Sequence, residues 1–148
     1  MITYKKATLD EKEIADLIKL SKMWEDEECT FGLVGNTKDD IHEPLYVAYD
    51  DDKLVGYIMG KYFVEDQKRS YIEVGDKCFE VEELYVIPSY RSKGIGKTLF
   101  SLIEKEVKDN VKYIVLGTST KDYKKTLKFY IDDNDMTYHS AFLIKKTK

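Results

Sequence analysis

A strand, a glycine-bearing loop and a helix follow one another without interruption between residues 83 and 99, and this unit limits the folds open to the chain. The strand ends at Val86-Ile87, and Gly94 and Gly96 allow the backbone to turn tightly and approach a ligand closely. The first N–H groups of a helix have no partners within it and carry the positive end of its dipole. The segment therefore predicts a binding site for a phosphate or pyrophosphate group.

The spacing of this loop differs from two common nucleotide-binding motifs. A Walker loop would place Gly-Lys-Ser/Thr after a four-residue gap, and the dinucleotide motif would place a third glycine where Leu99 stands. Arg91, Lys93 and Lys97 would add mobile positive charge around the bound group. The bare pattern Arg-x-x-Gly-x-Gly is also typical of an ordinary turn with surface lysines. Features elsewhere in the chain are therefore needed to distinguish a phosphate-binding loop from an ordinary turn.

Hydrophobic periodicity on both sides of the loop predicts a mixed α/β domain that takes up residues 1–148 as a single unit. Asp10 is expected to cap the first helix in a capping box with Glu13. The predicted order is β-α-α-β-β-β-α-β-α-β around a central mixed sheet. The strands are expected near 2–6, 45–49, 54–63, 78–86, 111–117 and 138–145, with further strand material at 71–74, and the helices near 11–22, 37–41, 97–109 and 121–132.

Charge and composition exclude several classes of function. The net charge of −4 argues against nucleic acid as the main partner, since phosphate backbones bind basic surfaces. Cys29 and Cys78 are far apart and form neither a disulfide framework nor a metal cluster, so we expect two half-buried thiols and no metal. No signal peptide is visible and no apolar run approaches the ~20 residues of a membrane span, which predicts a cytoplasmic protein without a membrane partner.

Three features together resemble the GNAT superfamily of acetyl-CoA-dependent N-acetyltransferases: a strand ending in Val86-Ile87-Pro88, the pattern Arg91-x-x-Gly94-x-Gly96, and the late pair Phe129-Tyr130. The resemblance extends over nearly the whole chain in the order of its elements. It implies the GNAT acyltransferase fold and direct transfer of an acetyl group from acetyl-CoA to an amine in a ternary complex.

The resemblance also implies where acetyl-CoA would bind. The strand before the loop would separate from its parallel neighbour at a bulge, and the pantetheine arm would enter that gap. Its amides would pair with the backbone near Leu84, Tyr85 and Val86, while the loop would hold the pyrophosphate. The implied loop residues are Arg91, Ser92, Lys93, Gly94, Ile95, Gly96, Lys97 and Thr98.

Tyr130 aligns with the family tyrosine that protonates the departing thiolate. A phenol has an ordinary pKa near 10 and so remains a proton donor at neutral pH. The plainer interpretation is a core aromatic beside Phe129. The chain departs from the family at 132–136, where Asn134 would take the left-handed position usually given to glycine and lengthen the helix end by one residue.

Glu82 and Glu83, on the strand entering the site, are the candidates for the group that deprotonates the amine. Period-two alternation places Glu80 and Glu82 on one face of the strand and Glu83 on the other. A carboxylate in a buried strand is costly unless it is used or paired. Glu82 and Glu83 could therefore act as the base or as a substrate anchor, or they could form structural ion pairs.

The acidic stretch 24–41 corresponds to the variable acceptor-binding region of the family, and it could attract a polyamine, an aminoglycoside or a lysine-bearing peptide. A solvated helix face explains the same charges. The segment 63–75 could border the site or a partner in a homodimer. Transfer of a different acyl group and a non-catalytic acyl-CoA sensor with the same fold are the alternative functions.

Overall fold

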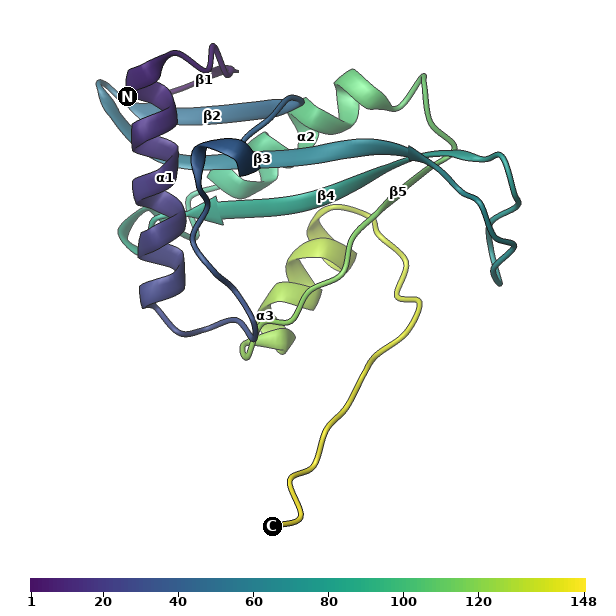
Figure 1. Cartoon of the computed structure of the whole chain (residues 1–148). Helices are drawn as coiled ribbons and strands as arrows, with labels where there is room; N and C mark the ends of the chain where they lie inside the picture. Colours follow the sequence, from purple (N-terminus) through teal and green to yellow (C-terminus); the bar gives the residue numbers. More distant parts are fainter.

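The computed structural model describes all 148 residues, and a five-stranded sheet forms its centre (Figure 1). The strands lie side by side in sequence order, the first three pairings are antiparallel, and the last pairing is parallel. Their bounds are β1 (Ile2–Lys6), β2 (Leu45–Asp50), β3 (Lys53–Val64), β4 (Lys77–Val86) and β5 (Tyr113–Val115).

Two long helices, α1 (Glu11–Asp26) and α2 (Ile95–Val107), cover opposite faces of this sheet (Figure 1). The apolar residues of both helices meet the buried residues of the middle strands and form one continuous core. A shorter helix, α3 (Tyr123–Lys128), follows β5 and continues as a π-helical turn, η3 (Phe129–Asp133). Short 3₁₀ turns occupy Lys38–Asp40 (η1) and Pro88–Tyr90 (η2). None of the helices has both the length and the apolar character needed to cross a bilayer.

The predicted fold class and the order of all elements up to α3 are confirmed, but several boundaries differ. The first helix continues four residues past the expected Lys22 to Asp26. The helix expected near 97–109 is α2 and begins at Ile95, because Gly94 serves as its N-cap. The helix expected near 37–41 is the 3₁₀ turn η1. β5 spans three residues instead of seven, and residues 71–74 lie in turns and loops instead of a strand.

The predicted last strand, 138–145, is wrong for this structure. Residues 135–148 form neither helix nor strand, and the chain leaves the body as an extended tail (Figure 1). A strand is stable only when a neighbour accepts its backbone hydrogen bonds, and the tail lies beside no other strand of its own chain. The composition of residues 138–145 favours a strand, but composition does not supply the partner strand.

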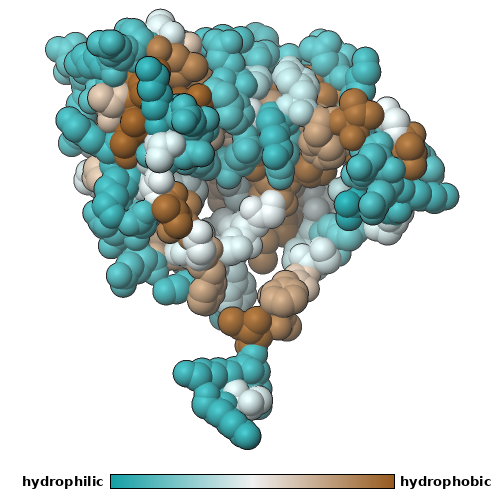
Figure 2. Space-filling model, in the orientation of Figure 1, coloured by the Kyte–Doolittle hydropathy of each residue, from teal (hydrophilic) through white to brown (hydrophobic).

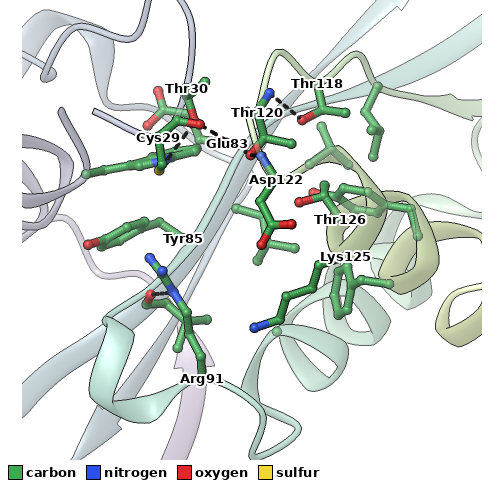
Figure 3. A pocket seen from close by; sticks show the side chains of 18 of the residues that line it. Cys29, Thr30, Glu83, Tyr85, Arg91, Thr118, Thr120, Asp122, Lys125 and Thr126 are labelled. Atoms are coloured by element: carbon green, nitrogen blue, oxygen red, sulfur yellow. Dashed lines mark hydrogen bonds between the residues drawn. The ribbon is translucent and has the colours of Figure 1, made fainter. Parts of the chain in front are cut away.

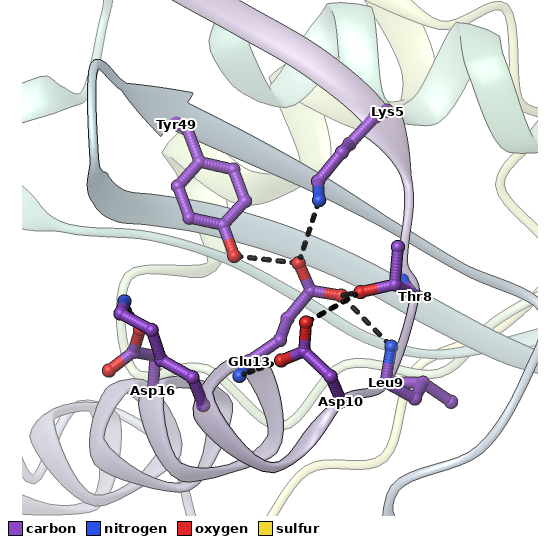
Figure 4. A network of polar contacts seen from close by, with 8 residues as sticks. Lys5, Thr8, Leu9, Asp10, Glu13, Asp16 and Tyr49 are labelled. Carbon is purple, nitrogen blue, oxygen red and sulfur yellow. Dashed lines mark hydrogen bonds and ion pairs between the residues drawn. The ribbon is translucent and has the colours of Figure 1, made fainter.

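The start of α1 is held by a buried carboxylate (Figure 4). Asp10 accepts a hydrogen bond from the Glu13 N–H at 2.8 Å, as expected for an N-cap. The Glu13 carboxylate, however, reaches past Asp10 to the N–H groups of Thr8 at 2.7 Å and Leu9 at 3.1 Å. On its other side it accepts from the Tyr49 hydroxyl at 2.6 Å, so it ties the β1–α1 connection to β2.

Replacing Glu13 with Gln is expected to lower the free energy of unfolding by about 1–3 kcal/mol, because an amide puts a donor where a buried acceptor is required. Burial raises the pKa of Glu13, but the bonds from Tyr49 and the two N–H groups outweigh it and hold the pKa below its ordinary value. The ionised carboxylate therefore stabilises the fold above pH 4.5, and this contribution is lost as the pH falls further.

Urea unfolding at pH 7 and at low pH measures this contribution, with the exposed first-turn acid in Glu11→Gln as the matched control. The loss in free energy of unfolding caused by Glu13→Gln should be largest at pH 7 and should become smaller at low pH. An equal, small loss in both variants at pH 7 would show that the network contributes nothing.

Candidate active site

The parallel pairing of β4 with β5 is short, and a cavity opens where it ends. The last paired residues are Glu80 and Val115; beyond them β4 continues to Val86 bonded only to β3. A cavity of about 850 Å³ lies between this part of β4, the connection from β5 to α3, and the loop that enters α2 (Figure 3). Such a gap gives an extended ligand access to an unpaired strand edge.

A bulge in β4 sits beside this gap. Met59 of β3 is opposite Glu83, whereas the next residue, Gly60, is opposite Val81, so Glu82 is the extra residue. A Cβ at Gly60 would lie 2.3 Å from the Glu80 carbonyl oxygen, which means that only glycine allows the two strands to come this close.

The bulge changes the expected directions of the two glutamates. Strict alternation predicts opposite faces, but both carboxylates contact the same connection between α1 and β2: Asn36 donates to Glu83 at 2.8 Å, and the His42 ring nitrogen lies 2.8 Å from Glu82. A bulge re-aims side chains in this way. Both glutamates line the cavity.

The two carboxylates differ in how they are held. One oxygen of Glu83 accepts from Asn36 and from the Tyr57 hydroxyl at 2.5 Å, while its second oxygen has no partner within the chain. Burial and the neighbouring Glu83 charge raise the pKa of Tyr57, which therefore stays protonated as a donor. Glu82 has a partner at each oxygen, His42 at one and Lys61 at 3.9 Å from the other. Glu83 alone offers a fixed carboxylate with a free oxygen.

A run of free backbone donors begins the loop before α2. The N–H groups from Ser92 to Lys97 have no acceptor within the chain. Gly94 has φ +85°, a left-handed conformation that turns the chain into the helix. Successive free N–H groups at a helix start can bind an anion, so this geometry is compatible with the predicted phosphate site.

The positive charges around this loop are arranged differently from the expectation. Arg91 is not mobile: its guanidinium donates to the Val86 carbonyl and to Glu27, both at 2.9 Å, and lies over the Tyr85 ring. The Tyr85 hydroxyl donates to the same Glu27 carboxylate. Burial is the main cause that raises the pKa of Tyr85, and this hydrogen bond is the second. Arg91 therefore joins the end of β4 to the end of α1.

Most of the predicted cofactor residues line the cavity. These are Leu84, Tyr85, Val86, Arg91, Ser92, Gly94, Ile95, Gly96 and Lys97. Lys93 and Thr98 do not; Lys93 lies over the Tyr90 ring and Thr98 bonds the Gly94 carbonyl. Lys125 and Lys128 of α3 line it as well, although their sequence pattern is that of an ordinary exposed helix face.

Tyr130, in η3, also lines the cavity and packs against the rings of Phe100 and Phe129. Burial raises its pKa to about 12, and its hydroxyl makes no hydrogen bond within the chain. The expected left-handed Asn134 is wrong: its φ is −125°, its side chain caps the Phe129 carbonyl at 2.9 Å, and Asp135 is the left-handed residue.

A clasp, defined here as residues 29–31 bonded to residues 118–121, crosses one side of the cavity (Figure 3). Thr30 and Thr120 form an isolated bridge, and Phe31 donates to the Ser119 carbonyl at 3.0 Å. Cys29 lies in this clasp beside the cavity, whereas Cys78 is buried elsewhere; both thiols are free. No sequence pattern indicates the clasp, because its two halves are far apart in the chain.

Comparisons with known proteins agree with this fold. The model of the acetyltransferase (GNAT) family matches residues 11–131. The structure is similar to a ribosomal-protein-alanine N-acetyltransferase from Brucella melitensis biovar Abortus 2308, with 16% identity over 99% of each chain and a TM-score of 0.67. No curated protein matches the sequence.

Two aminoglycoside acetyltransferases are similar as well. One, from an uncultured soil metagenomic sample and bound to sisomicin, has 15% identity over 99% of this chain and 97% of its own, with a TM-score of 0.67. The other, AAC(6')-Iy bound to CoA, has 14% identity over 100% of both chains and a TM-score of 0.67. At identities this low, the structural similarity shows a shared fold alone.

Substituting Gly94 with Ala is expected to lower the free energy of unfolding by about 1–2 kcal/mol, the cost of a left-handed conformation for an L-residue. Gly117→Ala is the matched control, since both glycines have open space for a Cβ but only Gly94 has a positive φ. Thermal or urea unfolding compares the two. Equal losses would mean that the turn before α2 does not require the left-handed conformation.

Proposed function

The chain belongs to the GNAT family of acetyltransferases, and we propose that it transfers the acetyl group of acetyl-CoA to a primary amine of a small molecule or peptide. The observation that carries the proposal is the run of free N–H groups from Ser92 to Lys97 beside the gap between β4 and β5. A diphosphate and an extended amide-bearing arm fit these two features together, as they do in CoA.

Donor groups of this chain suit the pyrophosphate and the pantetheine arm of acetyl-CoA. The N–H groups before α2 would hold the pyrophosphate, with Lys97, Lys125 and Lys128 adding positive charge. Beyond Glu80 the side of β4 that faces the gap has no strand partner, so its backbone near Leu84 could pair with the pantetheine amides. The reaction needs no metal.

We assign the two proton transfers to Glu83 and Tyr130. The amine loses a proton to the free oxygen of Glu83, directly or through a water, and its nitrogen then forms a bond to the thioester carbonyl carbon. A backbone N–H at the β4 bulge would stabilise the resulting oxyanion. The carbon–sulfur bond breaks, and Tyr130 donates its proton to the departing thiolate. The second proton lost by the amine nitrogen returns to the Tyr130 oxygen, directly or through water.

The acceptor would enter on the clasp side of the cavity. Trp24, stacked on Tyr85 at 5.2 Å, and the carboxylates of Glu82, Glu83 and Asp122 line the cavity. An aromatic wall with nearby carboxylates suits a cationic amine. Solved relatives with this fold are named as aminoglycoside and ribosomal-protein-alanine acetyltransferases, which is consistent with a small-molecule or peptide amine.

We propose that residues 1–148 act as one N-acetyltransferase domain, in the cytoplasm and without nucleic acid or a membrane as partner. The net charge of −4 supports the exclusion of nucleic acid. A homodimer is a candidate assembly.

A CoA-release assay with acetyl-CoA and a panel of polyamines, aminoglycosides, amino acids and peptides tests the function. Turnover is expected on one class of amine, with kcat lowered at least ~10²-fold in Tyr130→Phe and binding of acetyl-CoA retained. With its pKa raised to about 12, Tyr130 should remain a donor throughout the neutral range.

The exposed Tyr123 of α3 provides the matched control, and Tyr123→Phe should keep full activity. Full activity in Tyr130→Phe would remove the proton-donor role. Binding of acetyl-CoA without turnover on any amine would favour an acyl-CoA sensor, and turnover only with a longer acyl-CoA would favour a different acyl group. Absence of acetyl-CoA binding would refute the proposal.

The two glutamates can be separated by matched substitutions. Glu83→Gln is expected to lower kcat/KM at least ~10²-fold at pH 7, because an amide cannot take the amine proton. Glu82→Gln, whose carboxylate already has partners at both oxygens, should lower it less than ~10-fold. The opposite order in steady-state kinetics would assign the base to Glu82.

A further inference from the structure

The charge of Arg91 is neutralised before any ligand reaches the cavity. Arg91 lines the cavity, and its guanidinium lies 2.9 Å from the Glu27 carboxylate. The other cations of the lining are freer: Lys128 lies 4.0 Å from its acidic neighbours, and Lys97 and Lys125 form no ion pair within the chain. Arg91 is therefore the lining cation whose charge is cancelled by a close partner.

Glu27 reaches Arg91 from outside the cavity. It is the C-cap residue of α1 and does not line the cavity. One of its oxygens, Oε2, accepts both from the Tyr85 hydroxyl and from Arg91. A ligand in the cavity would meet Tyr85 and Arg91, so any effect of Glu27 on that ligand passes through these two side chains.

Trp24, Tyr85 and Arg91 form a stack on one side of the cavity, called here the acceptor wall. The Tyr85 ring stacks on Trp24 at 5.2 Å, and the Arg91 Cζ atom lies 5.4 Å from the centre of the Tyr85 ring. Figure 3 shows Tyr85 and Arg91 on one side of the cavity and Asp122 and Lys125 on the other. The surface is hollowed between the segment after α1 and α3 (Figure 2), so an acceptor that enters there passes the acceptor wall.

An unpaired guanidinium on the acceptor wall would act on the two ligands in opposite directions. It would repel an ammonium group and attract the phosphates of acetyl-CoA. At an effective dielectric constant of about 20, a unit charge about 10 Å away changes a binding constant roughly 10-fold. A paired carboxylate cancels most of this field, whereas a neutral hydrogen-bond partner would leave it in place.

We propose that Glu27 is a specificity-determining residue, which cancels the charge of Arg91 and so allows an amine of net positive charge, such as a polyamine or an aminoglycoside, to bind as the acceptor. This inference rests on the proposed function, which supplies an anionic acyl donor and an amine acceptor. A free amino acid is disfavoured, because its carboxylate would need an unpaired arginine and Arg91 is already paired. Glu27 acts through Arg91 and Tyr85, so it is a positioning residue and takes no part in the proton transfers.

Binding of the two ligands to Glu27→Gln tests the proposal, because glutamine keeps the size of the side chain and an acceptor oxygen but removes the charge. Trp24 is the only tryptophan of the chain and lies in the acceptor wall, so its fluorescence measures dissociation constants without turnover. The titrated ligands are acetyl-CoA and the amine that is acetylated fastest, or spermidine where no amine is acetylated. Glu28→Gln is the matched control, since Glu28 is the exposed neighbour and forms no ion pair.

In Glu27→Gln the Kd of the amine should rise roughly 10-fold while the Kd of acetyl-CoA falls at least ~3-fold. Both shifts should become smaller in about 1 M NaCl, which screens charges. Glu28→Gln should change neither Kd by more than ~2-fold. Arg91→Gln leaves Glu27 unpaired and should shift both constants the other way, so it serves as the second variant if Glu27→Gln does not fold.

Weaker binding of both ligands to Glu27→Gln, or no change in either Kd, would overturn the proposal, because a purely structural role does not move the two constants in opposite directions. Failure of this inference is distinct from failure of the proposed function. Turnover by the wild type together with equal constants in Glu27→Gln and Glu28→Gln would keep the function and refute the role of Glu27. A wild type that binds neither ligand would refute both.

Discussion

The close approach of β3 to β4 at Gly60 is the constraint on which the site depends. A side chain there would meet the Glu80 carbonyl oxygen and the Phe79 ring at 2.3–2.6 Å, so the strands can come together only over glycine. The bulge at Glu82 follows immediately, and the pairing of β4 with β5 ends at Glu80. The bulge and the end of the β4–β5 ladder thus occur within a few residues of each other.

Two further contacts keep the opened end of β4 in place. Glu27, at the end of α1, accepts from both Tyr85 and Arg91, and Arg91 in turn holds the Val86 carbonyl. Asn36 and Tyr57 hold Glu83 from the other side. Polar groups around the cavity are therefore oriented before any ligand arrives, which reduces the reorganisation needed during a reaction. The clasp at residues 29–31 and 118–121 closes one side of the same cavity.

The sequence predicts the fold class and the glycine turn before α2 well because both depend on local patterns. Alternation, capping and the Gly94 turn act within a few residues, and the resemblance to GNAT proteins places them in order. The direction of Glu82 could not be predicted, since one extra residue in β4 interrupts the alternation. Lys125, Cys29 and the paired state of Arg91 likewise depend on which distant segments meet.

Residues 138–145 of the C-terminal tail also show that the sequence does not determine which segments pair. Their composition favours a strand, yet the energy of a strand belongs to a pair of backbones and to the apolar surface that the pair covers. Phe142, Leu143 and Ile144 remain exposed because residues 138–145 lie beside no other strand of the chain.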